Sequence, residues 1–393
     1  MQIVQESLTC LPELSKPRRK FMLEMFSLLL SLRGRANYRN LSRYSDYEEK
    51  TFQRNARKPF PFQALNVKLA EQTLSDSCVL VGDASFISKS GTKTYGLASF
   101  WNGSAKRSER GLELSALALV DEYRQAMTLS VSQTPSEMDA SSRIDFYLQQ
   151  VQESQPYWPK DMQYAIFDGY YSKQTFVNGI AALGLDMIGK LRKDANLRYL
   201  YRGSRRRVGR PKIFDGKVFY DDVERWERLG ELEPGIYGFA QNLWHVSLER
   251  EIRVVMLLNA KDRENETHIL LFSTDLKLSA EQIIVHYGSR FAIEFLFRDA
   301  KQHLGLSHCQ ARNKAALDFH FNACMSALNL AKVNAFKGVE SSDGFVFSMH
   351  SQKCLFFNEH LLERFISKFA LNRTLIKSHP EYENLRNYGV IAA

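Results

Sequence analysis

Apolar and polar residues follow two different periods along this chain, and the change falls near residue 76. Apolar positions recur at helical spacing in Arg18–Leu32, so we expect residues 1–75 to be helical. From Ser77 onward the apolar residues form short runs bounded by turn residues, which is typical of β-strands. Three such strands are predicted first, at "CVLVGD" (78–83), "TYGLASFW" (94–101) and "LELSALALVD" (112–121).

The next part of the chain alternates helical and strand patterns. A polar stretch at Ser136–Ser154 predicts a helix, and "YAIFDG" (164–169) predicts a short buried strand. "SKQTFVNGIAALGL" (172–185) is helix-like, and "DMIGKLR" (186–192) predicts another strand. Three strands followed by helix, strand, helix and strand indicate an α/β fold with a mixed sheet.

Beyond residue 195 the pattern favours strands again and then helices. Ser279 with Gln282 has the spacing of a capping box, which predicts a helix from there through Gln302. The remaining C-terminal sequence is mostly helical in pattern. We therefore expect five regions: a helical region (1–75), a first core part (76–194), a β-rich insertion (195–268), a second core part (269–335) and a helical C-terminal region (336–393).

Composition narrows the class of protein. The 393 residues are 44% hydrophobic and 12% aromatic, enough to form their own cores. No apolar stretch approaches the ~20 residues needed to span a bilayer, and Glu24 interrupts the nearest candidate, Phe21–Leu32. The five cysteines are scattered, without a Cys-x-x-Cys pair, so we expect reduced thiols in a cytoplasmic protein with no membrane partner.

Positive charge is concentrated in two stretches of the chain. The formal net charge is +9, and residues 16–58 carry twelve Lys or Arg against four acids. Residues 190–217 carry eleven against two and include the cluster Arg205, Arg206, Arg207 and Arg210. Such clustering predicts a polyanionic partner, with these arginines binding DNA; the alternative is two solvated basic surfaces.

Two aspartates share a local sequence context. Asp83 follows the apolar run Cys78–Val81 and Gly82, and Asp168 follows Ala165–Phe167 and precedes Gly169. An aspartate at the carboxyl end of a buried strand lies where α/β sheets bind their ligands. Asp121 ends another apolar run and is the alternative to Asp83, which we prefer because it ends the first strand.

A third carboxylate, Glu294, stands among six apolar residues in Phe291–Phe297. A charge buried there is unfavourable unless it is paired, protonated or bound to a metal. Three converging carboxylates need a cation, and oxygen-only ligands suit Mg²⁺ or Mn²⁺. The hypothesis is that Asp83, Asp168 and Glu294 bind metal, against the alternative that Glu294 simply pairs with Arg290 or Arg298.

The sequence around Glu294 places further functional groups on one helix face. At about 100° per residue, Tyr287, Arg290, Glu294 and Lys301 fall within an arc of roughly 60°. Arginine and lysine beside a metal-binding glutamate are suited to hold phosphates.

This Tyr-x2-Arg-x3-Glu-x6-Lys spacing resembles the YREK signature of bacterial insertion-sequence DDE transposases, and "DGYYSK" (168–173) resembles the second-aspartate motif of that family. The order of regions also matches. The resemblance implies a ribonuclease-H-like core in which Asp83, Asp168 and Glu294 are catalytic and bind two divalent ions. Tyr287, Arg290 and Lys301 would contact DNA.

The resemblance also implies an activity and its partners. The expected enzyme cuts double-stranded DNA at terminal inverted repeats and transfers the freed end into target DNA, acting as a homodimer. The interval of 126 residues from Asp168 to Glu294 exceeds the ~30 of one βαβ unit, which an inserted β-domain explains. The alternatives are a nuclease of the same fold without strand transfer and an inactive DNA-binding derivative.

Three weaker patterns remain open. "VGRPK" (208–212) resembles an AT-hook core, although phosphate contact without sequence preference explains it equally well. Trp226 and Trp244 either stack on a flipped base or pack in a core. The set His303, His308, Cys309, His320 and Cys324 has no common zinc-finger spacing.

Overall fold

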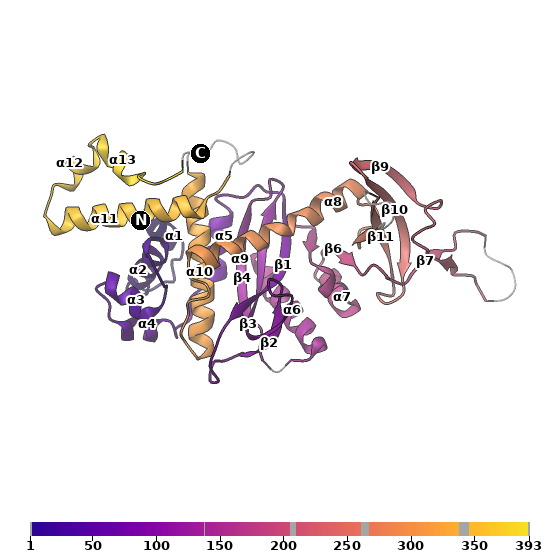
Figure 1. Ribbon diagram of the computed structural model, residues 1–393, viewed down its shortest axis with the longest axis horizontal. Helices are drawn as coiled ribbons and strands as arrows, with labels where there is room; N and C mark the ends of the chain where they lie inside the picture. Colours follow the sequence, from indigo (N-terminus) through magenta and orange to yellow (C-terminus); the bar gives the residue numbers. More distant parts are fainter. Residues whose placement is uncertain (1, 137, 205–209, 261–266, 338–345, 392–393) are drawn as a thin grey trace.

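The computed structural model describes residues 2–136, 138–204, 210–260, 267–337 and 346–391 of the chain. They form an elongated α/β structure with helices of both termini at one end and a β-rich segment at the other (Figure 1). The α-helices are α1 (Gln2–Thr9), α2 (Lys16–Ser31), α3 (Tyr38–Leu41), α4 (Glu49–Asn55), α5 (Phe62–Ala70), α6 (Ala140–Ser154), α7 (Gln174–Ala182), α8 (Ala280–Ser289), α9 (Phe291–His303), α10 (Lys314–Phe336), α11 (Met349–Lys368), α12 (Arg373–Lys377) and α13 (Glu381–Arg386). The helical N-terminal and C-terminal regions are as the sequence predicts.

One sheet runs through the described part of the molecule. Its strands are β1 (Cys78–Ser88), β2 (Ala98–Asn102), β3 (Arg107–Asp121), β4 (Ala126–Gln133), β5 (Tyr164–Ile166), β6 (Asp186–Leu191), β7 (Leu197–Leu200), β8 (Phe214–Lys217), β9 (Glu227–Glu233), β10 (Ile236–His245), β11 (Arg250–Asn259) and β12 (Thr267–Ser273). Short 3-10 turns lie at Ser42–Tyr44, Gln155–Tyr157 and Gly169–Tyr171.

Five strands form the central part of the sheet, in the order β4-β3-β1-β5-β6. The first three strands of this core, β1, β3 and β4, are antiparallel neighbours, whereas β1–β5 and β5–β6 are parallel. This order and these directions define a ribonuclease-H-like core, which confirms the predicted fold class.

Two details of the predicted strands were wrong. The first strand does not end at Asp83: β1 continues to Ser88, because it pairs with β3 along its whole length and Asp83 lies opposite Ala116. The strand Ala126–Gln133 was not predicted at all. All but one of its positions are buried, but its small and hydroxyl residues interrupt the apolar run by which a buried strand is recognised in sequence.

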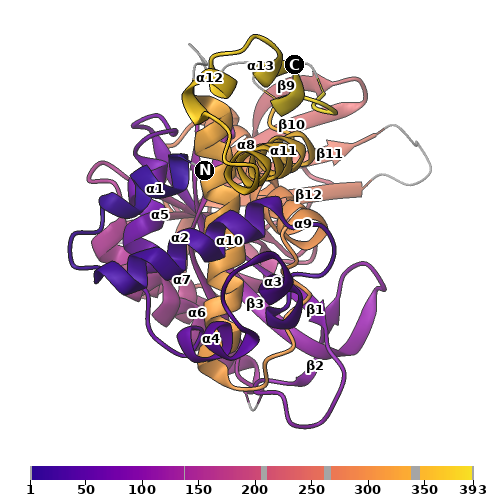
Figure 2. The same cartoon turned by 90° about the vertical axis from the view of Figure 1, so that its left-hand side faces the viewer.

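Strand β4 lies at an edge of the core, and side chains of α10 satisfy its outer backbone groups. Asn329 accepts a hydrogen bond from the Thr128 amide and donates one to the Thr128 carbonyl. Asn322 donates to the Val131 carbonyl, and the buried Lys332 donates to the Ala126 carbonyl. Buried backbone groups require partners, so these polar residues let α10 cover a sheet edge. Figures 1 and 2 show α10 between the N-terminal helices and the sheet.

The β-rich segment continues the core sheet. Strand β12 pairs antiparallel with β6 on one side and with β11 on the other. The segment predicted at 195–268 contains β7 to β11 and the beginning of β12. Trp226 is buried there, and the ring of Trp244 lies 5.8 Å from that of Phe214, so both tryptophans pack within the segment.

The predicted helix from Ser279 has its capping box, with the Ser279 hydroxyl accepting from the Gln282 amide. It is interrupted once, at Arg290, which separates α8 from α9. Helix α9 packs on β1, β3 and β4, whereas α8 packs on β6, β11 and β12. In the ranges that the structure describes, no helix combines the length and the apolar character needed to cross a membrane.

Candidate active site

The two predicted aspartates belong to neighbouring parallel strands, Asp83 within β1 and Asp168 just beyond the end of β5. Strands β1 and β5 pair with Leu80 opposite Ala165 and Val81 opposite Ile166. Extending this register by two residues places Asp168 beside Asp83. Asp83 lies in the middle of its strand, whereas Asp168 follows the end of β5 and caps a 3-10 turn by accepting a hydrogen bond from the Tyr170 amide.

Arg290 joins Asp83 to the third predicted carboxylate. Its guanidinium lies 3.2 Å from Asp83 Oδ2 and 2.7 Å from Glu294 Oε1. The Arg290 and Asp83 side chains are only 12% and 19% exposed. One cation at the junction of α8 and α9 therefore holds a carboxylate of the sheet and a carboxylate of the helix together.

The expectation that Glu294 is buried was wrong. Its side chain is 50% exposed, because Phe291, Glu294, Phe295 and Arg298 share the outer face of α9. The apolar residues that contact the sheet are on the other face and include Ile293, Leu296 and Phe297. Glu294 does have a partner, and that partner is Arg290.

Burial and a neighbouring negative charge both act on the Asp83 carboxyl. Burial, and then the negative charge of Asp168, raise the pKa of Asp83 to about 7, although Arg290 opposes this shift. Arg290 alone therefore does not offset burial and the charge of Asp168. A divalent cation would do so, and a set of carboxylate oxygens without nitrogen or sulfur suits Mg²⁺ or Mn²⁺.

In the described ranges, no three His, Cys, Asp or Glu side chains are arranged to hold a metal ion. The geometry gives the reason at the predicted site, since the Arg290 guanidinium binds oxygens of both Asp83 and Glu294. The chemistry of the carboxylates fits a divalent cation, but Arg290 and Glu294 would have to rearrange for all three acids to bind it.

Tyr287 and Lys301 lie on either side of Arg290 along the same helices. Burial raises the pKa of Tyr287, with the nearby Arg290 charge opposing the shift. Lys301 donates hydrogen bonds to Ser85 Oγ, at 2.8 Å, and to the Phe86 carbonyl, at 2.9 Å. The Lys301 ammonium thus contacts strand β1 directly. The role of Ser85 was not foreseen, and its only signal was its spacing of two residues from Asp83, which puts both on one face of the strand.

The alternative aspartate, Asp121, has a structural role at the end of β3. Its carboxylate accepts hydrogen bonds from the amides of Tyr123 and Gln125, and a longer one from Ser75. These bonds fix the turn into β4. Asp121 lies at one end of the β1–β3 pairing, opposite Cys78, whereas Asp83 lies in its middle, opposite Ala116.

The remaining predicted residues fall outside this site or outside the described ranges. Arg205, Arg206 and Arg207 lie outside the described residues, and Arg210 is exposed. His320 and Cys324 are neighbours on α10, where His320 Nε2 donates to the Gly305 carbonyl. His308 Nδ1 accepts from the Ala36 amide.

The fold and the acid pair together define a class of protein: a ribonuclease-H-like domain with one carboxylate on a central strand, a second just beyond the parallel strand next to it, and a third on a helix that packs on the sheet. The sequence model of the protein family described as "Transposase DDE domain" matches residues 74–330. The chain belongs to this family of DNA transposases.

Similarity to individual known proteins is low. The solved piggyBac transposase synaptic complex with hairpin DNA is 11% identical, with a TM-score of 0.41, over 93% of this chain and 75% of that chain. Aquifex aeolicus Argonaute is 10% identical, with a TM-score of 0.24, over 58% of this chain and 28% of that chain. No curated protein sequence matches the chain.

Proposed function

We propose that this protein is a cut-and-paste transposase of a bacterial insertion sequence, of the group that carries the YREK signature. One observation carries the proposal: within a transposase DDE domain, Asp83 on β1 and Asp168 just beyond the parallel strand β5 are neighbours, and Arg290 links Asp83 to Glu294. The substrate is double-stranded DNA with terminal inverted repeats, and the second substrate is target DNA.

Asp83, Asp168 and Glu294 would hold divalent ions, Mg²⁺ or in its place Mn²⁺. When bound, such ions activate a water or a 3′-hydroxyl and stabilise the leaving oxygen of a phosphodiester. Arg290 keeps the carboxylates together before this cation binds and is then free to contact a phosphate oxygen. Tyr287 and Lys301 flank it, so α8 and α9 carry a row of phosphate-binding groups beside the acids.

The wider assignment rests on the same family relation. The enzyme acts as a homodimer that pairs two element ends, in the cytoplasm at the nucleoid. Residues 1–75 and the basic cluster Arg205, Arg206, Arg207 and Arg210 bind DNA. Catalysis is assigned to the two core parts, residues 76–194 and 269–335. DNA binding and assembly are assigned to the flanking and inserted regions, residues 1–75, 195–268 and 336–393.

The decisive experiment uses duplex DNA copied from the two sides of the gene, with Mg²⁺ or with EDTA. Wild-type protein is compared with Glu294→Gln, Asp83→Asn and Asp168→Asn. Glu281→Gln, an acid at the start of α8, is the matched control. We expect wild type and the control to nick the DNA and join it to a target plasmid only with Mg²⁺.

Each carboxylate variant should lower the cleavage rate by at least roughly 10²–10³-fold while still binding the ends. Cleavage without joined products would identify a nuclease of the same fold. Binding without cleavage by the wild type, with Mg²⁺ and with Mn²⁺, would identify an inactive DNA-binding derivative. If one carboxylate variant cleaves the DNA at the wild-type rate, the residue changed in it is not catalytic.

A further inference from the structure

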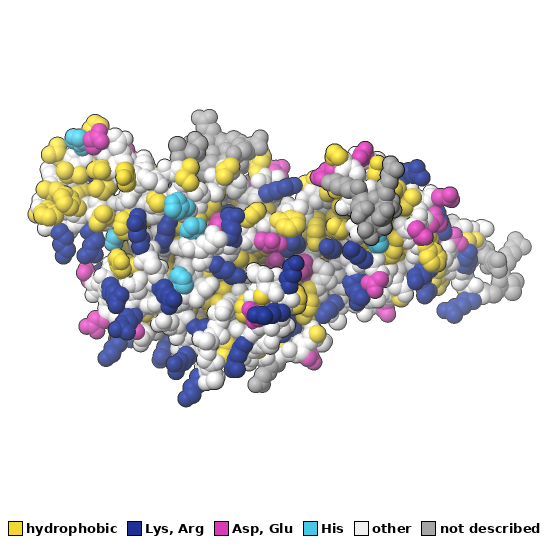
Figure 3. Space-filling view, viewed as in Figure 1, with side chains coloured by type: hydrophobic (Ala, Val, Ile, Leu, Met, Phe, Trp, Pro, Cys, Tyr) yellow, Lys and Arg dark blue, Asp and Glu magenta, His cyan; other side chains and the backbone are white. Residues whose placement is uncertain are grey.

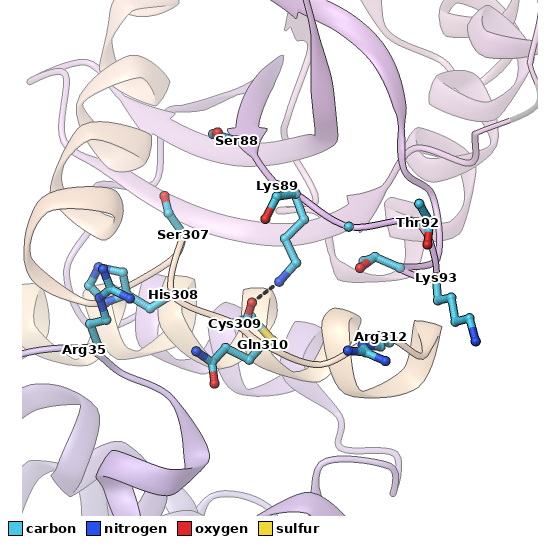
Figure 4. Close-up of a pocket in the computed structure, with 13 residues that line it drawn as sticks. Arg35, Ser88, Lys89, Thr92, Lys93, Ser307, His308, Cys309, Gln310 and Arg312 are labelled. Carbon is cyan, nitrogen blue, oxygen red and sulfur yellow. Dashed lines mark hydrogen bonds between the residues drawn. The ribbon is translucent and has the colours of Figure 1, made fainter.

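A basic pocket of about 880 Å³ lies beyond the candidate active site. One wall is Ser88–Thr94, which leaves the end of β1, and the other is Ser307–Arg312, between α9 and α10. Figure 4 shows these two walls, with the Lys89 ammonium reaching across to the Cys309 carbonyl and Arg35 entering from a third segment. The pocket thus joins the N-terminal helical region to the core.

The charges around this pocket have one sign. Arg35, Lys89, Lys93 and Arg312 line it, and among the residues that the structure describes no acidic side chain does. His308 also lines it, but burial lowers its pKa, so it adds little charge near neutral pH. A lining with several cations and no carboxylate is suited to an anion.

A second pocket of about 350 Å³ adjoins the first and shares Cys309, Gln310 and Arg312 with it. It adds Arg39 and Arg57 from the N-terminal region. It also contains one acid, Glu49, which accepts a hydrogen bond from Gln53.

Five of these cations are exposed, namely Arg35, Arg39, Arg57, Lys93 and Arg312. Within the described part of the chain, none of the five takes part in an ion pair. Figure 3 shows many Lys and Arg side chains over the N-terminal helices on the face it presents. The two pockets together are called the basic double pocket below.

The same two elements connect the acids to the basic double pocket. Along β1, the distance from Asp83 to Ser88 is five residues, or roughly 17 Å. Helix α9 runs beside it from Glu294 to His303, about 14 Å, and Lys301 bonds the two elements together. Since base pairs are stacked 3.4 Å apart, this distance is about five base pairs of duplex DNA.

We propose that the basic double pocket binds the phosphodiester backbone of the DNA end, about five nucleotides from the bond that is cut at Asp83, Asp168 and Glu294. The inference rests on the proposed function and adds to it the path of the substrate. The two pockets together are larger than a single phosphate needs, and their cations come from three chain segments, which suits a run of successive phosphates. Contacts from Arg35, Arg39 and Arg57 would fix the N-terminal region and the core to the same stretch of DNA.

The test measures DNA binding in EDTA, so that it does not depend on cleavage. Arg35→Ala, Lys93→Ala and Arg312→Ala are combined, because each side chain is exposed and should not be needed for folding. Lys160→Ala is the control: this exposed lysine lines a different pocket together with Cys78, at the opposite end of β1. The probe is a duplex copied from the DNA beside the gene, at several salt concentrations.

We expect the triple variant to lower the slope of log affinity against log salt by about 2–3, because each lost phosphate contact contributes about 0.9. Neutral methylphosphonates placed four to six nucleotides from the cleaved bond should lower the DNA affinity of wild type and leave the DNA affinity of the triple variant unchanged. The proposal would be overturned, while the transposase function stands, if the triple variant kept the salt-dependence slope of wild type and lost as much affinity as wild type on methylphosphonate DNA. Wild-type protein that neither binds nor cuts the duplex would overturn both.

Discussion

The ring of Phe167 lies directly over the backbone of Gly82. A Cβ atom at residue 82 would come within 2.1 Å of Phe167 Cε1, a distance that real contacts do not allow. Gly82 precedes Asp83 and Phe167 precedes Asp168, so the close approach joins the backbones that carry both carboxylates. The glycine is required here for space, since its φ is not in the left-handed region.

Gly82→Ala should therefore disturb the site as well as the fold. The added methyl group must displace Phe167, which we expect to lower the free energy of unfolding by about 1–3 kcal/mol and to reduce cleavage. Gly103→Ala is the matched control, because nothing lies within 4 Å of a Cβ there. Thermal melting and the end-cleavage assay measure the two effects. The double variant Gly82→Ala, Phe167→Leu should recover part of the stability; no recovery would mean that the clash is elsewhere.

The contact between Gly82 and Phe167 also shows what could and could not be predicted from sequence. Short apolar runs beside glycine identified the two strands, β1 and β5, to which the aspartates belong, because strand pairing depends on those runs. The end of β1 was misplaced, since beyond Asp83 the strand is held by its partner β3 rather than by its own apolar residues. Strand β4 was missed for a related reason: it is stabilised by α10, which comes about 190 residues later in the chain.

Side-chain contacts between distant segments could not be predicted. The helix face carrying Tyr287, Arg290, Glu294 and Lys301 followed from helical geometry, but the ion pair of Arg290 with Asp83 joins residues 207 positions apart. The basic double pocket was missed for the same reason. Its cations belong to three segments, and only Arg35, Arg39 and Arg57 fall in a stretch that was noticeably basic in sequence.

Removing Arg290 should make stability depend on divalent ions. Arg290 pairs with Asp83 and Glu294 and partly offsets their charge, and its loss leaves a mostly buried carboxylate beside Asp168 without a counter-charge. Arg290→Ala should lower the free energy of unfolding by roughly 3 kcal/mol in EDTA. Added Mg²⁺ should then raise the melting temperature of the variant more than that of wild type, because a ligand that binds only the folded state stabilises it.

Arg298→Ala is the control for this experiment, since Arg298 lies on the same helix and pairs with its neighbour Asp299. It should respond to Mg²⁺ like wild type. An equal Mg²⁺ response in Arg290→Ala and wild type would show that Arg290 and the cation do not share a binding site.

His320 should make the fold sensitive to acid. It is fully buried on α10, and burial lowers its pKa from 6.5 to about 4. As the pH falls from 6.5, the unfolded chain takes up a proton while the folded chain does not, so the unfolded state becomes favoured. The contribution of neutral His320 to the free energy of unfolding is fully present above pH 6.5. It falls by roughly 3 kcal/mol in total as the pH is lowered to about 4.

His320→Gln tests this, because glutamine retains a donor for the Gly305 carbonyl but does not titrate in this range. The melting temperature of wild type should approach that of the variant as the pH falls from 7 to 4.5. His379→Gln, at an exposed histidine, should follow wild type throughout. A constant difference between His320→Gln and wild type across this range would contradict the assignment.

The arginines Arg205, Arg206 and Arg207 provide a prediction that depends only on charge. If they bind DNA, changing all three to alanine removes up to three phosphate contacts and lowers the salt-dependence slope by up to about 2.7. Affinity should fall equally for element ends and for unrelated duplexes, because phosphate contacts carry no sequence information. A loss restricted to A·T-rich duplexes would instead favour the AT-hook interpretation of "VGRPK", and Arg210→Ala should then have the larger effect. Lys160→Ala with Lys277→Ala is the control, and a slope equal to wild type in the arginine variant would show that this cluster does not contact DNA.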